Sequence, residues 1–218
     1  TIEELHSSWS ERTDTPADAA LKLLPPRLTN LVGGETACVE IRLGATHLIC
    51  DSGTGARPLG YDLMVRKITG DVHLFLSGLD WCYIQGWPFF IPGYIPPNTI
   101  HFYSADINLE EGMVRQQNLE HFPVTFTDPG HARKVFHRSA QEWSVGSGKL
   151  RISSLSNGTQ CLRLTDSGQS VGYWMNTTNV DLLSYTEFFQ NVDFLCLGFP
   201  SRREREEDFV TAALALSR

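Results

Sequence analysis

The sequence predicts an α+β fold in which two β-sheets pack face to face and helices cover their outer sides, a four-layer αββα sandwich. Two observations support this prediction. The strands and helices indicated by the pattern of apolar residues occur in two similar runs along the chain. A chain of 218 residues with 41% hydrophobic content can also bury a substantial core as one domain. We therefore expect a single domain over residues 1–218, with residues 1–30 as a divergent N-terminal segment.

The first run of elements starts with a predicted hairpin. Apolar and polar residues alternate on both sides of a Gly44–Ala45 turn, which is typical of two half-buried antiparallel strands. A glycine-rich loop, an amphipathic helix, two buried strands and a short helix follow. Upstream, Asp14 or Thr15 could cap a short helix that two prolines end. The expected ranges are 16–24, 36–44, 46–55, 56–67, 71–78, 100–106 and 110–119.

The second run contains strands first and helices later. Four segments with a strand-like pattern precede an amphipathic helix, a buried strand and a charged terminal helix. The mixed-sign charges of the terminal helix are typical of a solvated helix face with i, i+4 pairs. The expected ranges are 132–139, 143–155, 160–166, 170–176, 180–190, 192–199 and 202–217.

The charge balance limits the partners that the chain can bind. A formal net charge of −7 and a pI near 5.5 argue against broad contact with DNA, RNA or anionic lipid. We therefore predict no nucleic-acid partner and no membrane partner. No apolar run approaches the roughly 20 residues that span a bilayer, and the first residues are too polar for a signal peptide.

The cysteines indicate the compartment. Their number is odd and they show no close pairing, unlike the cysteines of small secreted domains that disulfides hold together. We therefore expect a reducing, cytoplasmic setting. The five residues are Cys38, Cys50, Cys82, Cys161 and Cys196.

Several segments, in a fixed order, resemble one family of hydrolases. The longest are GGETACVEIRLGATHLICDSGTGARPLG at 33–60 and HLFLSGLDWCYIQGWPFFIPGYIPPNTIHFYSAD at 73–106, and three shorter segments continue the likeness. Over roughly residues 32–199 the chain resembles the metallo-β-lactamase superfamily, in the branch of small phosphodiesterase-like and ribonuclease Z-like enzymes. This resemblance implies the same four-layer αββα sandwich.

The resemblance also implies where a metal site would lie. The family carries a His-x-His-x-Asp-His motif at the end of a buried strand, and later ligands complete a site for two zinc, iron or manganese ions whose bound hydroxide attacks the substrate. No histidine follows residue 137, so the last ligand is either replaced or lies beyond Arg218. The residues at the other ligand positions are Gly78, Asp80, Cys82 and Tyr83, then Ser156 or Asn157, and Asn176.

These residues predict a degenerate site. Only Asp80 and Cys82 are good metal ligands, and two ligands do not make a closed or a catalytic site. We therefore predict no bound metal, no cofactor and no catalytic residue. The chain is then a pseudoenzyme with a regulatory, sensory or interaction role, for example within a longer signalling protein. Two alternatives stay open: a phosphodiesterase-like hydrolase with a reduced metal site at Asp80 and Cys82, and a small-molecule receptor.

A receptor would use the vacated cleft, which the resemblance places between the sheet edges. Such a cleft can hold a small ligand, or it can be filled by the side chain of Tyr83. Asp51 matches an aspartate that the family keeps beneath the site, and we expect it to be structural through hydrogen bonds to the neighbouring loop. The predicted cleft residues are Gly78, Asp80, Cys82, Tyr83 and Asn176.

A ridge rich in proline and aromatic residues spans 88–103. An exposed apolar patch of this kind generally marks a contact surface, and in the family this region often lies near a dimer contact. We predict a symmetric homodimer with Tyr94, Ile95 and Pro96 at or near the interface. The alternative is a monomer in which the ridge folds back over the cleft. Another protein or further domains of the same chain are also open as partners.

Overall fold

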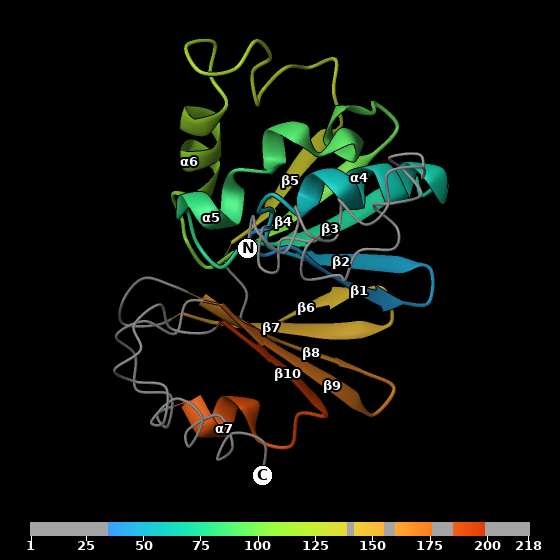
Figure 1. Ribbon diagram of the computed structural model, residues 1–218. Coiled ribbons are helices and arrows are strands. Elements are labelled where there is room, and N and C mark those ends of the chain that lie inside the picture. Colours follow the sequence, from blue (N-terminus) through green and yellow to red (C-terminus); the bar gives the residue numbers. More distant parts are fainter. Residues whose placement is uncertain (1–34, 139–141, 155–159, 176–184, 199–218) are drawn as a thin grey trace, which may run out of the picture. The chain divides into compact units, whose positions relative to one another are not determined.

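The computed structural model describes residues 35–138, 142–154, 160–175 and 185–198 (Figure 1). All of these residues except Glu35 belong to one compact unit, Thr36–Arg218. The helices expected at 16–24 and 202–217 lie outside the described residues, as does the first part of the helix expected at 180–190.

The first sheet contains five strands in the order β1-β2-β3-β4-β5. β1 and β2 form the expected antiparallel hairpin around Gly44, whose φ of 57° favours glycine. All other neighbours in this sheet are parallel, so the C-terminal ends of β2 to β5 lie along one edge. The bounds are β1 (Val39–Leu43), β2 (Thr46–Cys50), β3 (Asp71–Phe75), β4 (Thr99–Tyr103) and β5 (Arg133–His137).

The second sheet has the order β10-β9-β8-β7-β6. β6 to β9 form an antiparallel meander, and β10 is parallel to β9. The strand segment expected at 143–155 is a hairpin, with a turn at Gly146, where φ is 58°. The bounds are β6 (Glu142–Val145), β7 (Gly148–Ser154), β8 (Gln160–Asp166), β9 (Gln169–Trp174) and β10 (Phe194–Leu197).

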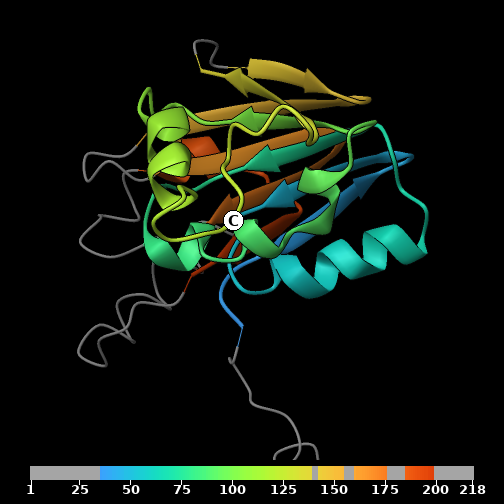
Figure 2. The ribbon, with the colours of Figure 1, turned by 90° about the horizontal axis from the view of Figure 1, so that it is seen from above.

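Helices lie on the outer side of each sheet (Figures 1 and 2). Those that follow β2, β3 and β4 pack on the first sheet, and α7 packs on the second sheet. Across the described residues, each helix is too short or too polar to pass through a bilayer. The bounds are α4 (Ala56–Val65), α5 (Trp81–Ile84), α6 (Leu109–Gln116) and α7 (Thr186–Phe189), with 3-10 helices η1 (Trp87–Phe89) and η2 (Ile91–Tyr94).

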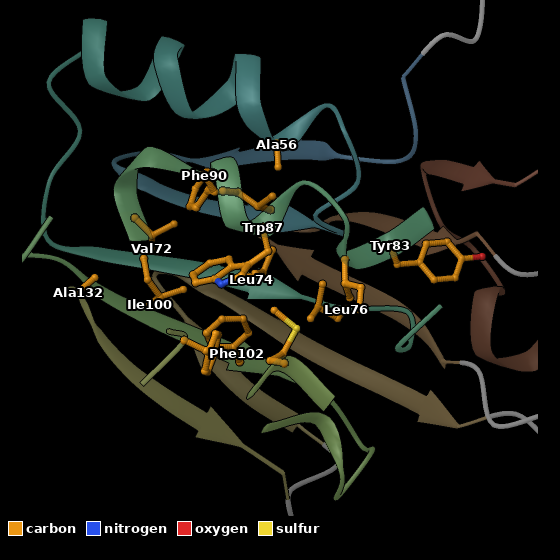
Figure 3. Packing of buried hydrophobic residues seen from close by; sticks show 14 of the residues in the cluster. Ala56, Val72, Leu74, Leu76, Tyr83, Trp87, Phe90, Ile100, Phe102 and Ala132 are labelled. Atoms are coloured by element: carbon orange, nitrogen blue, oxygen red, sulfur yellow. The ribbon is translucent and has the colours of Figure 1, made fainter. Parts of the chain in front are cut away.

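Separate apolar clusters join these layers. Leu48 and Phe75 of the first sheet pack with Leu162 of the second, which makes a core between the sheets. A second core lies between the first sheet and its helices, where the ring centroids of Trp87 and Phe102 are 5.1 Å apart (Figure 3). The layers therefore alternate as helix, sheet, sheet, helix, and the predicted αββα fold class is confirmed.

Candidate functional site

The segment that follows β3 forms one end of the sandwich. The strand expected over 71–78 ends at Phe75, and a buried stretch then leads to α5. In this stretch the Ser77 N–H donates to the Asp51 carboxylate and not to a neighbouring strand, while Leu76 remains in the core. Because the stretch is as buried as the strand, its apolar pattern could not indicate where the strand ends.

Gly78 and Asp80 have different surroundings. Gly78 is buried, yet a Cβ atom built on it would meet no described atom within 4 Å beyond its chain neighbours. Asp80 is exposed, and its backbone C=O accepts a hydrogen bond from the Tyr83 N–H at 2.9 Å. Gly78 therefore borders space that the described side chains leave unfilled, whereas Asp80 lies at the surface.

Cys82 and Tyr83 lie in α5, where their surroundings favour the uncharged side chains. Burial, and then the Asp80 carboxylate, raise the pKa of the Cys82 thiol. Tyr83 is 7% exposed, and burial raises the pKa of its phenol, with Cys82 adding to the effect. Figure 3 shows the Tyr83 ring pointing away from the rings of Trp87 and Phe102. A neutral thiol and a neutral phenol are weak metal ligands.

Asp51 is fully buried beside this segment. Ser77 donates to it twice, from the backbone N–H to Oδ1 at 2.7 Å and from the hydroxyl to Oδ2 at 2.8 Å. The Tyr173 hydroxyl donates to the same Oδ2 at 2.8 Å. Burial raises the pKa of Asp51 to about 7, although these hydrogen bonds act to lower it. The bond to the neighbouring loop is therefore present, and the structural role of Asp51 stays a prediction.

Sequence reasoning missed Tyr173 and Gln160, two buried residues that tie the sheets together. The Gln160 backbone N–H donates to the Ser77 C=O at 3.0 Å. Its side-chain oxygen accepts from the Ala105 N–H at 2.6 Å, and its side-chain amide donates to the Ser104 hydroxyl at 2.8 Å. Local sequence patterns carry no signal for partners so far apart along the chain.

The described residues at the strand end do not fit the pair of metal ions that the fold family implies. Gly78 has no donor atom, and the raised pKa values of Cys82 and Tyr83 oppose metal binding. Within the described ranges, no group of three or more His, Cys, Asp or Glu side chains could hold a metal ion. The predicted cleft residue Asn176 lies outside those ranges, as do Ser156 and Asn157.

The residues predicted at a dimer interface lie in and after η2. The Tyr94 hydroxyl donates to the Pro88 C=O at 2.6 Å and accepts from the Gln117 side-chain amide at 3.0 Å. Tyr94 and Ile95 are partly buried, and Pro96 is exposed. Tyr94 is thus held by its own domain, and Pro96 is the exposed residue of the predicted interface.

Comparison of the sequence with protein-family models and with curated proteins gives no match. Solved structures do match. The metallo-β-lactamase fold protein YhfI from Bacillus subtilis aligns with 76% of this chain at 17% identity and a TM-score of 0.53. Zn²⁺-bound PqqB from Methylobacterium extorquens aligns with 82% at 10% identity and a TM-score of 0.56. The human short form of tRNase Z aligns with 84% at 12% identity and a TM-score of 0.55.

The matched part of these proteins differs in extent. The chain spans 65% of YhfI and 61% of PqqB, less than two thirds of either, and 81% of the short form of tRNase Z. Identities this low establish a likeness of fold and leave the chemistry of the site to the residues that are present.

Proposed function

Because the chain has the metallo-β-lactamase fold but no histidine between Gly78 and Tyr83, we propose that it is a non-catalytic module of this fold. In this proposal the domain acts through binding or contact, in a regulatory or sensory role, and hydrolyses no substrate. The compartment that we propose is the cytoplasm, because the number of cysteines is odd and their spacing shows no close pairing.

The chemistry of the strand end carries the proposal. A two-metal hydrolase needs neutral imidazoles and carboxylates that converge on its ions. Gly78 supplies no ligand atom, and burial of Tyr83 favours the phenol over the phenolate. The raised pKa of the Cys82 thiol also disfavours the reduced metal site at Asp80 and Cys82, because the thiolate is the form that binds metal.

The metal content of the purified protein tests the proposal. We expect less than one zinc, iron or manganese ion per chain by elemental analysis after dialysis. The described ligand atoms are too few, and the Cys82 thiol and Tyr83 phenol stay protonated.

An activity assay is the second test. Turnover of bis-nitrophenyl phosphate should stay at the buffer level, with or without added manganese. The Asp80→Ala variant is the matched control and should give the same values. Stoichiometric metal that is lost in Asp80→Ala would contradict the proposal and favour the reduced metal site.

A second candidate function is a small-molecule receptor. The observation that favours it is the unfilled space beside buried Gly78. A leucine at this position would occupy that space without meeting a described neighbour at the Cβ atom. Mass spectrometry of the small molecules released from denatured wild-type and Gly78→Leu protein distinguishes this candidate from a module without a ligand.

A further inference from the structure

Three histidines lie on neighbouring strands of the first sheet, on the face that packs toward the second sheet. His73 of β3 is paired in register with His101 of β4, and His137 of β5 is paired with Tyr103. Residues two apart on a strand share a face, so these side chains lie on the side of Phe75 and Tyr103, which belong to the core between the sheets. We call His73, His101 and His137 the histidine ladder.

The rings of the ladder are stacked. The ring centroids of His73 and His101 are 4.9 Å apart at an interplanar angle of 20°, and those of His101 and His137 are 5.3 Å apart at 22°. Tyr103 stacks on His137 at 4.6 Å, and Trp143 of β6 meets the Tyr103 ring edge-on at 5.8 Å. The ladder is therefore part of the packing that joins β4 and β5 to β6.

Polar contacts link the ladder histidines to one another and to Asp71 and Tyr103. The 3.0 Å contact between His101 Nδ1 and His137 Nε2 requires one nitrogen to donate and the other to accept. His101 Nε2 is 3.3 Å from the Asp71 carboxylate and has no other partner among the described groups. His73 Nδ1 contacts the Tyr103 hydroxyl at 2.9 Å.

The surroundings of His73 disfavour a proton on its ring. Asp71 is the described carboxylate that favours the charged form of His73, while Tyr103, Trp143 and the register partner Leu48 carry no charge at neutral pH. Burial lowers the pKa of His73 to about 4, and the neighbouring ladder histidines act in the same direction. Burial and His101 also lower the pKa of His137. Two stacked imidazolium rings at these separations would repel each other.

The backbone connects the ladder to the strand-end site. The Ser104 N–H donates to the His137 C=O at 3.3 Å, and the Ser104 hydroxyl accepts from the buried Gln160 amide. Any movement of His137 away from β4 therefore acts on the residues that bridge the two sheets beside Gly78.

We propose that the histidine ladder is a pH-responsive element: its rings pack in the neutral form between the sheets, and a proton on His73 loosens the packing of β4 and β5 against β6. Because the pKa of His73 in the folded protein lies below the ordinary histidine value near 6.5, neutral His73 stabilises the fold fully above that value. This stabilisation is lost as the pH falls toward about 4. The proposal holds whether or not the strand-end site binds a ligand.

Urea unfolding at pH 7.5 and 5.0 tests the proposal. The ratio of the unfolding equilibrium constant at pH 5.0 to that at pH 7.5 should be about tenfold lower in His73→Phe than in wild type, because this variant keeps an aromatic ring and removes the titrating nitrogen. The control is His121→Gln, because His121 is exposed and bonded within its own turn. This control should keep the wild-type pH dependence.

Histidine side-chain NMR on the wild-type protein gives an independent readout that does not depend on a variant folding. The His73 ring should keep the chemical shifts of neutral imidazole at pH 5.0. A His73 ring that titrates near 6.5 would overturn the proposal. An equal effect of acidification on wild type and His73→Phe would overturn it as well.

Discussion

Asp51 illustrates at the scale of one residue how burial can set a charge state near neutral pH. Three hydrogen-bond donors favour its carboxylate, but burial dominates and raises its pKa to about 7. A carboxyl group whose folded pKa lies above its unfolded value stabilises the fold fully below the unfolded value, here 3.8. That stabilisation is lost as the pH rises toward 7.

We therefore expect Asp51→Asn to reduce the loss of stability between pH 5 and pH 8, because the amide carries no charge to bury. The difference in unfolding free energy should be roughly 1–4 kcal/mol across this range. Urea unfolding at both pH values measures it, with Glu120→Gln at an exposed position as the control. If the unfolding free energy of Asp51→Asn and of wild type changed equally between pH 5 and pH 8, Asp51 would not titrate in this range. Asp51 makes the fold less stable as the pH rises, whereas the histidine ladder makes it less stable as the pH falls. The Asp51 and His73 variants therefore separate the two contributions to the pH dependence of stability.

The positions after β3 could be predicted from the sequence because the motif of the family that the chain resembles has fixed spacing, and their role as a site stays a prediction. The structure places Gly78 in the stretch after β3, Asp80 at the N-cap of α5, and Cys82 and Tyr83 in α5. Tyr173 could not be identified in this way. Its hydroxyl reaches Asp51 from the other sheet, 122 positions away in the chain, and strand alternation shows only that its side chain is buried.

At the scale of elements, Gln160 links the start of β8 to the segments after β3 and β4. We expect Gln160→Met to destabilise the fold by about 1–3 kcal/mol, because the Ala105 N–H and the Ser104 hydroxyl would lose their buried partner. Chemical denaturation measures the change, and hydrogen exchange should become faster at the Ala105 amide. Gln169→Met, at an exposed position of β9, is the control. Unchanged exchange at Ala105 would contradict this role.

Helices and strands whose apolar residues recur at a regular spacing were predicted well. The β1–β2 hairpin follows from alternation around a glycine turn, and α4 follows from apolar residues at helical spacing. Ends of elements were less accurate. β3 stops at Phe75 and not at residue 78, because the hydrogen-bond partner of Ser77 is a side chain far along the chain.

At the scale of the whole molecule, the predicted homodimer would form through the segment that contains Tyr94, Ile95 and Pro96. Tyr94 is bonded within its own domain, so substitutions at Ile95 and Pro96 are the sharper test. We expect light scattering at micromolar concentration to give a dimer mass for wild type and a lower mass for Ile95→Glu with Pro96→Glu, because two carboxylates would oppose an apolar contact. Pro129→Glu, in an exposed turn, should leave the mass unchanged. A wild-type monomer would rule out the dimer.

The division of the strands between the sheets also matters during synthesis of the chain. Among the described strands, β1 to β5 form the first sheet and end at His137, whereas β10 of the second sheet ends at Leu197. At about 5–20 residues per second, the intervening chain takes roughly 3–12 s to leave the ribosome. During these seconds the inner face of the first sheet, which bears Leu48 and Phe75, lacks its cover from the second sheet. This interval is when the nascent chain exposes the most aggregation-prone surface and when a chaperone would have most to protect.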